Sequence, residues 1–239
     1  RPAFADRPLP NFILRLLVMF AGIACVALGI AVSRATDLGL AAISTLPGVI
    51  NYAAPAISLG TATFAFNVLL VLVQMCLLGR RFHPIQLLSI PFVVVFSALI
   101  DCFVPVAMAL PMPSYLARLL FCLVSCAIIA LGVWLQAKAA LILLPGDGFA
   151  WAVGSRFNLP FGKAKMITDS SLIALAALLS FALMGGLYGV REGSIIAAVS
   201  VGLFIRGLNA AFPGVERVLP LAGHITWIPR NEAEESGRH

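Results

Sequence analysis

The sequence predicts an all-α protein that crosses a lipid membrane several times and is built from two related halves. Hydrophobic residues make up 61% of the chain and charged residues only 11%, and the mean hydropathy is +1.03. Soluble proteins carry about 25% charged residues, so lipid must be the solvent for most of this surface. Long apolar stretches recur along the chain, and the second half repeats the pattern of the first.

Six stretches are long and apolar enough to cross a bilayer, which takes roughly 20 residues each. They are Asn11–Ser33, Thr61–Leu78, Ile85–Val104, Tyr115–Gln136, Ala164–Leu187 and Gly193–Phe212. The first lacks a small-residue cleavage site, so we interpret it as a retained span and not as a secretory signal. The connections are short, so we expect an N-terminal segment at 1–10, one membrane domain at 11–212 and a partly disordered tail at 213–239.

Basic residues collect in alternate connections, which predicts the orientation. The basic segments are the N-terminus, the Arg80–Arg81 connection, the connection from Lys138 to Lys165, and the tail. Short cytoplasmic loops are enriched in Lys and Arg, so we expect a multi-pass protein with both termini in the cytoplasm. The formal charge of +6 follows from this topology and does not indicate a nucleic-acid partner.

Two connections are too apolar for ordinary loops and are broken by proline and glycine. Asp37–Gly60 contains Pro47, Gly48 and Pro55, and Leu141–Gly162 has the same character. Each is long enough to cross once as a broken helix, or to enter the membrane and return. The alternation of basic connections favours six crossings and two re-entrant segments. Irregular backbone at membrane depth persists only where protein or a water-filled cavity satisfies its polar groups.

An internal repeat sets the expected architecture. Arg15–Val32 aligns with Arg118–Leu135 at an offset of 103 residues, and Leu59–Leu70 aligns with Phe161–Leu172 at an offset of 102. We therefore expect one repeat at about 11–105 and a second at about 114–212. Three crossings per repeat is an odd number, so the second copy inserts upside down, as in many secondary transporters. The alternative is that duplication produced only a stable bundle.

Some segments also resemble a known group of proteins. The run PGDGFAWAVGSRFNLPFGKAKMITDSSL, the later run GGLYGVREGSIIAAVSVGLFIRGL and the first-half run LGTATFAFNVLLVLVQMCLLGRRF resemble the YczE/YyaS/YitT-like bacterial membrane proteins. The resemblance covers most of Leu14–Leu208. It implies a protein of the bacterial cytoplasmic (inner) membrane, of largely unassigned activity and often regarded as permease-like. Unlike many relatives, this chain has no acidic residue between Gly39 and Gly48.

Asp169 is the leading candidate for a site residue. It lies about 10 Å of helix beyond Gly162, where an ionisable side chain costs at least about 2.5 kcal/mol unless it has a partner or a cavity. One interpretation is a substrate site in which Asp169 also carries a coupling proton. The other is a structural ion pair with Lys165, one helical turn earlier. Thr168 and Ser170 flank it with hydroxyl groups.

The other candidate substrate-binding residues follow from the repeat. Asn67 aligns with Asp169, and Asp147 aligns with Thr45. Asn67 has the alternative of an interhelical hydrogen bond, and Asp147 that of a cap for a helix beginning near Phe149. Asn51 and Trp151 complete the candidates; Trp151 is equally interpreted as an interfacial anchor.

An enzyme is not expected. All three histidines lie outside the predicted spans, as does every glutamate, so no H-E-x-x-H pattern or carboxylate–imidazole cluster stands in the membrane. No G-x-x-x-x-G-K-[ST] loop is present, which excludes a self-contained ATP motor. We expect no metal site and no cofactor.

The sequence therefore favours a secondary transporter or permease for a small polar or anionic solute. The solute would bind near the midplane between the two hairpins, with alternating access from either side. The alternative is a non-transporting accessory or regulatory protein that acts through a membrane partner. Besides the lipid bilayer and the solute, a second copy of the chain in a homodimer is left open.

Overall fold

The computed structural model describes residues 9–79, 84–139, 141–142, 144–159 and 161–212. The described residues form eight α-helices and one short 3-10 helix, and they contain no strand. The helices are α1 (Leu9–Thr36), α2 (Ala42–Ala53), α3 (Leu59–Leu78), α4 (Ser89–Met108, preceded by η2, Pro84–Leu88), α5 (Tyr115–Ala139), α6 (Pro145–Phe157), α7 (Phe161–Met184) and α8 (Glu192–Ala211). The all-α prediction is confirmed.

Six of these helices are long and apolar enough to cross a membrane, as predicted: α1, α3, α4, α5, α7 and α8. Their ends differ from the predicted ends by a few residues. Helix α1 continues to Thr36, past Ser33, and α7 ends at Met184, before Leu187. The chain breaks after Met184 because Gly185 has a φ of +67°, a left-handed conformation that glycine adopts without steric cost.

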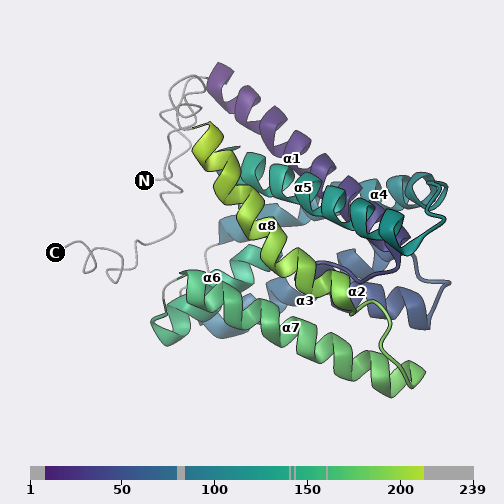
Figure 1. Ribbon diagram of the computed structural model, residues 1–239. Helices are drawn as coiled ribbons and strands as arrows, with labels where there is room; N and C mark the ends of the chain where they lie inside the picture. The colour runs from purple at the N-terminus through teal and green to yellow at the C-terminus, as the bar shows by residue number, and fades with distance from the viewer. Residues whose placement is uncertain (1–8, 80–83, 140, 143, 160, 213–239) are drawn as a thin grey trace.

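The helices run between two ends of the bundle (Figure 1). Helix α1 begins and α8 ends at what we call the first end; α1 ends and α8 begins at the second end. Helix α7 runs from the first end to the second. This arrangement agrees with an even number of crossings between the start of α1 and the end of α8.

Helices α2 and α6 are about half the length of a span. They have 12 and 13 residues, or about 18–20 Å at the usual helical rise, against a bilayer core of about 30 Å. Their first turns meet: a Cβ built on Gly146 of α6 would lie 2.8 Å from Ile43 Cδ1 of α2. The two short helices thus bring their N-terminal ends together inside the bundle.

The centre of the bundle is the crossing of α1 and α5, where glycines allow the backbones to approach closely. A Cβ on Gly132 would lie 2.6 Å from the Gly22 carbonyl oxygen and 2.7 Å from Val26 Cγ2. On the other side of the crossing, a Cβ on Gly29 would lie 2.5 Å from Ile129 Cγ1. Small residues at such crossings are typical of membrane helices, because packing replaces the hydrophobic effect as the driving force there.

The remaining contacts occur in pairs. Helix α4 packs on α1 and α8 packs on α5; α2 packs on α7 and α6 packs on α3; α2 also packs on α3 and α6 on α7. One pair is unequal, since α3 packs along α4 whereas α7 and α8 make no comparable contact. The exposed side chains of α7 and α8 include Leu178 and Ile195, each 70% exposed, as expected for lipid-facing positions.

Asp101 is more than the end-of-span charge that its sequence position suggests. Its carboxylate accepts hydrogen bonds from Ser58 Oγ at 2.6 Å and from the Gly60 amide at 2.7 Å. It therefore satisfies the free N–H group of Gly60 at the start of α3 from a neighbouring helix. This interhelical cap also gives the negative charge the positive end of a helix dipole.

We expect Asp101→Ala to lower the free energy of unfolding by about 1–2 kcal/mol, because it removes a cap and leaves an amide without its acceptor. Chemical denaturation in detergent measures this loss. Thr61→Ala, in the same first turn of α3, is the control and should cost much less. Equal losses in the two variants would contradict the capping role.

Candidate functional site

Three charged side chains form an ion triad inside the membrane domain. Lys165 Nζ lies 3.1 Å from Asp147 Oδ1 and 3.0 Å from Asp169 Oδ1. The three side chains are between 28% and 37% exposed. One ammonium therefore serves two carboxylates, and the triad carries one uncompensated negative charge when all three groups are ionised.

Two helices supply the triad, and the turn between them sets its geometry. Lys165 and Asp169 stand one turn apart on α7, while Asp147 comes from the antiparallel α6. Asn158 adopts a left-handed conformation after α6, with a φ of 52°. Asparagine tolerates this conformation better than most residues. Helix α7 then begins at Phe161.

The start of α6 differs from the expected one. The helix begins at Pro145 and not near Phe149, so Asp147 lies in its first turn. Leu144, at the position before the helix, provides no side-chain cap. A carboxylate in the first turn interacts favourably with the helix dipole, and here it also contacts Lys165. Asp147 is thus an ion-pair partner as well as a first-turn acid.

Gln74 of α3 fixes the first turn of α6. Its side-chain amide donates a hydrogen bond to the Pro145 carbonyl at 2.9 Å, and the side chain is buried. A Cβ on Gly148 would lie 2.8 Å from Gln74 Oε1, so a larger residue there would displace the Gln74 amide from its present position. Gln74 thus holds the segment that carries Asp147.

The triad lies well away from the connection between α6 and α7. Along α6, Asp147 is about 15 Å from Phe157, and along α7, Asp169 is about 12 Å from Phe161. The connection between these helices is at the first end of the bundle, near the start of α7 (Figure 1). A bilayer core is about 30 Å thick, so the charges lie near its midplane if this connection lies at the surface.

Three of the other predicted residues make hydrogen bonds within their own helices. Asn67 Nδ2 donates to the Thr63 carbonyl at 2.8 Å, and Thr45 Oγ1 donates to the Ala42 carbonyl at 2.7 Å. Thr168 Oγ1 donates to the Lys165 carbonyl at 3.0 Å. All three are buried. The hydrogen bonds of Asn67 thus remain in α3 and do not extend to Asp169.

The last three predicted residues lie in different surroundings. Trp151 is buried and packs with Leu78 of α3, whereas Ser170 is exposed on α7. Asn51 lies away from the triad, at the end of α2. Its Oδ1 accepts a hydrogen bond from Arg34 Nε at 3.1 Å, and its Nδ2 donates to the Ile57 carbonyl at 2.9 Å.

Sequence reasoning missed a second polar group, which we call the interloop cluster: Arg34, Asp37, Tyr52, Arg191 and Glu192. Tyr52 donates a hydrogen bond to the Asp37 carboxylate, and the Arg34 guanidinium lies 3.7 Å from the centre of the Tyr52 ring. Burial and the hydrogen bond to Asp37 raise the pKa of Tyr52, so Tyr52 remains a donor at physiological pH. Arg191 completes the group with its Nη1 3.8 Å from Asp37 Oδ2.

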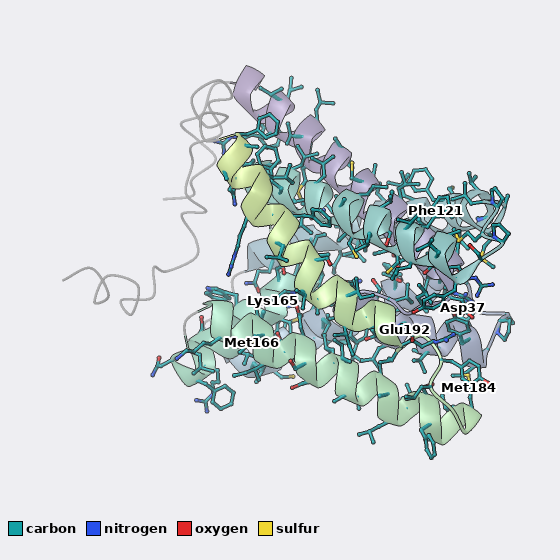
Figure 2. All side chains as sticks on the ribbon, in the orientation of Figure 1. Asp37, Phe121, Lys165, Met166, Met184 and Glu192 are labelled. Atoms are coloured by element: carbon teal, nitrogen blue, oxygen red, sulfur yellow. The ribbon has the colours of Figure 1, made fainter. Side chains whose placement is uncertain are left out.

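The interloop cluster and the triad lie at different places along the bundle. Figure 2 shows Lys165 beside α6 and the first part of α7, with Asp37 and Glu192 together toward the other end. The sequence signal was present, since Arg34 and Asp37 lie at the α1–α2 connection and Arg191 and Glu192 at the α7–α8 connection. Only the fold brings the two connections together.

The arrangement offers charge and hydrogen-bonding groups, not an evident metal site. Within the described ranges, no three His, Cys, Asp or Glu side chains gather closely enough to hold a metal ion. The triad itself offers two carboxylates and one ammonium, which can form and exchange ion pairs.

Comparison with known proteins gives a family but no activity. The family of unknown function DUF6198 matches residues 13–210. The chain belongs to this family. The matched DUF6198 region includes the triad and the interloop cluster. It also includes all six candidate spans, apart from Phe12 at the start of the first span and Ala211 at the end of the last. No curated protein and no solved structure matches the chain, so the function must be argued from the site itself.

Proposed function

We propose that this DUF6198 protein is a secondary transporter of a small polar or anionic solute, with the ion triad at its centre. The observation that carries the proposal is the Asp147–Lys165–Asp169 group, in which Asp147 lies in the first turn of the half-length helix α6. Ionisable side chains inside membrane domains are costly, and where they occur they commonly mark solute or proton pathways.

The proposal includes an inverted repeat, and three sets of contacts support it. If each of the helices α1–α4 is replaced by its equivalent among α5–α8, and the reverse, most of the helix pairs that pack together remain the same. The contact of Gly132 with Val26 has its counterpart in that of Gly29 with Ile129, and each residue pairs with its equivalent at the offset of 103.

The third supporting contact lies between the short helices. Ile43 touches Gly146, which is next to Pro145, the equivalent of Ile43 at the hairpin offset of 102. Such a contact is expected where a pseudo-two-fold axis passes between two re-entrant helices. The half-length of α2 and α6 also supports re-entrant segments over full crossings.

The charge of the triad fits proton coupling. With both carboxylates ionised, Lys165 cannot neutralise the pair alone. A proton on Asp169 makes the triad neutral. It also weakens the attraction between Asp169 and the Lys165 ammonium, which can then attract an anionic group. The N-terminal ends of α2 and α6 meet beside the triad and supply two positive dipole ends for the same ligand.

A thermal-shift screen of the detergent-purified protein against a metabolite library tests the proposal, with Asp169→Asn measured in parallel. A ligand at a hundredfold excess over its Kd raises the stability by about 2.7 kcal/mol. We expect a hit that disappears in Asp169→Asn while this variant remains folded. If no compound stabilises either folded protein, the proposal fails.

The alternative is an accessory or regulatory protein that acts through a membrane partner. No specific contact favours it, and the same screen distinguishes it because it requires no solute site. We also retain as proposals the relation to the YczE/YyaS/YitT-like proteins, the bacterial inner membrane as the location, the first end in the cytoplasm, and a homodimer.

A further inference from the structure

Two connections at the second end of the bundle are joined directly. The Leu40 amide donates a hydrogen bond to the Gly189 carbonyl at 3.1 Å, and the Gly193 amide donates to the Leu38 carbonyl at 2.7 Å. The α1–α2 connection belongs to the first half of the chain and the α7–α8 connection to the second. These backbone bonds therefore close one end of the molecule across its two halves.

The interloop cluster strengthens the same closure with charges. Arg191 Nη1 donates a hydrogen bond to the Asp37 carbonyl at 3.1 Å as well as lying near its carboxylate. Arg191 Nε lies 3.5 Å from Glu192 Oε2, and Arg34 binds Asn51 and the Tyr52 ring. Two arginines face two carboxylates, so the cluster is neutral and its charges are already compensated. Such a group is suited to holding two segments together and poorly suited to binding a further ion.

The first end of the bundle is not closed in the same way as the second. At the second end α3 packs along α4, and Asp101 joins them through Ser58 and Gly60. The equivalent helices α7 and α8 make no comparable contact. If the two halves are related by the repeat, their equivalent contacts are made on one side and missing on the other. This asymmetry is that of one state of a two-state molecule.

We propose that the interloop cluster is the extracytoplasmic gate of the protein, closed in this structure, and that its contacts break when the triad becomes accessible from outside. The inference rests on the proposed function, because a gate requires a central site with alternating access. Asp37 is the pivotal residue, since it contacts Tyr52 in its own half and Arg191 in the other.

Cysteine accessibility in intact cells tests the gate. Thr45 of α2 is fully buried, so Thr45→Cys, in a background without the five native cysteines, reports access from outside to a membrane-impermeant thiol reagent. We expect labelling to become about threefold to tenfold faster in Arg191→Ala and in Asp37→Asn, as the loss of a partly exposed ion pair and its charged hydrogen bond would produce. Asparagine also tolerates the left-handed conformation of residue 37, which has a φ of 56°.

Arg118→Ala is the matched control. It removes one positive charge from an exposed position in the first turn of α5, outside the cluster. Labelling no faster in Arg191→Ala and Asp37→Asn than in Arg118→Ala would overturn the gate. An increase confined to inside-out vesicles would overturn its assignment to the outer face.

The gate and the transport proposal fail in different ways. A solute that binds in the thermal-shift screen, combined with unchanged labelling, rejects the gate alone. If labelling becomes faster in both variants but no solute stabilises the protein, the second end does open when the cluster is broken, and the proposal that the protein transports a solute is rejected. Size-exclusion profiles in detergent show that each variant is folded before labelling is compared.

Discussion

Lys165→Met is expected to destabilise the protein more than any other single substitution in the triad. It removes the ammonium that lies 3.1 Å from Asp147 and 3.0 Å from Asp169, leaving two carboxylates close together without a counter-charge. Breaking a fully buried pair costs about 3–5 kcal/mol. The side chains here are about one-third exposed, so we expect a loss of about 1–3 kcal/mol in the free energy of unfolding.

Two further variants make this measurement decisive. Lys163→Met, two residues earlier and exposed, removes the same charge near the start of the same helix and should have little effect. Adding Asp147→Asn and Asp169→Asn to Lys165→Met should restore most of the lost stability, because no uncompensated charge remains. Denaturation in detergent measures all of them. Equal losses in Lys163→Met and Lys165→Met would show that the triad contributes nothing specific.

Gly132→Val is expected to have the second large effect, through packing and not through charge. Its Cβ would lie 2.6 Å from the Gly22 carbonyl oxygen and 2.8 Å from the Val26 amide nitrogen. Both are backbone atoms, so α1 and α5 would have to separate at the centre of the bundle. Overpacking of this kind costs about 1–3 kcal/mol and occasionally more, and we expect the upper part of that range.

Gly202 of α8 offers the matched control, because a Cβ there meets nothing within 4 Å. Gly202→Val should leave the unfolding midpoint nearly unchanged. Gly29→Val, the repeat equivalent of Gly132→Val, should destabilise the protein to a similar degree, since its Cβ would lie 2.5 Å from Ile129 Cγ1. Retention of the wild-type midpoint in Gly132→Val would contradict the close α1–α5 crossing.

The spans and their number could be predicted from the sequence because they depend on local composition. A helix in lipid must satisfy its backbone internally, so an apolar stretch of sufficient length is helical wherever it lies. The same reasoning predicted that the first hairpin is broken at Pro47 and Gly48, which is wrong, because α2 continues through both residues from Ala42 to Ala53. The same reasoning placed the start of α6 near Phe149, whereas the helix begins at Pro145. Proline is well suited to the first position of a helix, because its missing N–H would have no partner there.

Only part of the candidate site could be predicted from the sequence. The i,i+4 spacing of Lys165 and Asp169 is a property of one helix, and so it could be predicted. The contact of Lys165 with Asp147 joins two helices. No local sequence pattern predicts a contact between residues 18 positions apart on different helices. Asn51 was grouped with the hairpin residues, yet it lies beside Arg34, because α2 carries its two ends to different depths.

By itself, the sequence determined that this protein is a bundle of apolar helices with two half-length insertions, since lipid as a solvent leaves few alternatives for such a composition. Only the tertiary structure decided which charges meet. Lys165 could have paired with Asp169 alone, and Asp37 and Arg191 could have remained separate surface charges. Their partners lie 18 and 154 residues away along the chain. Contacts at such separations are set by how the helices pack, through backbone approaches at Gly22, Gly132 and Gly193 that no local pattern encodes.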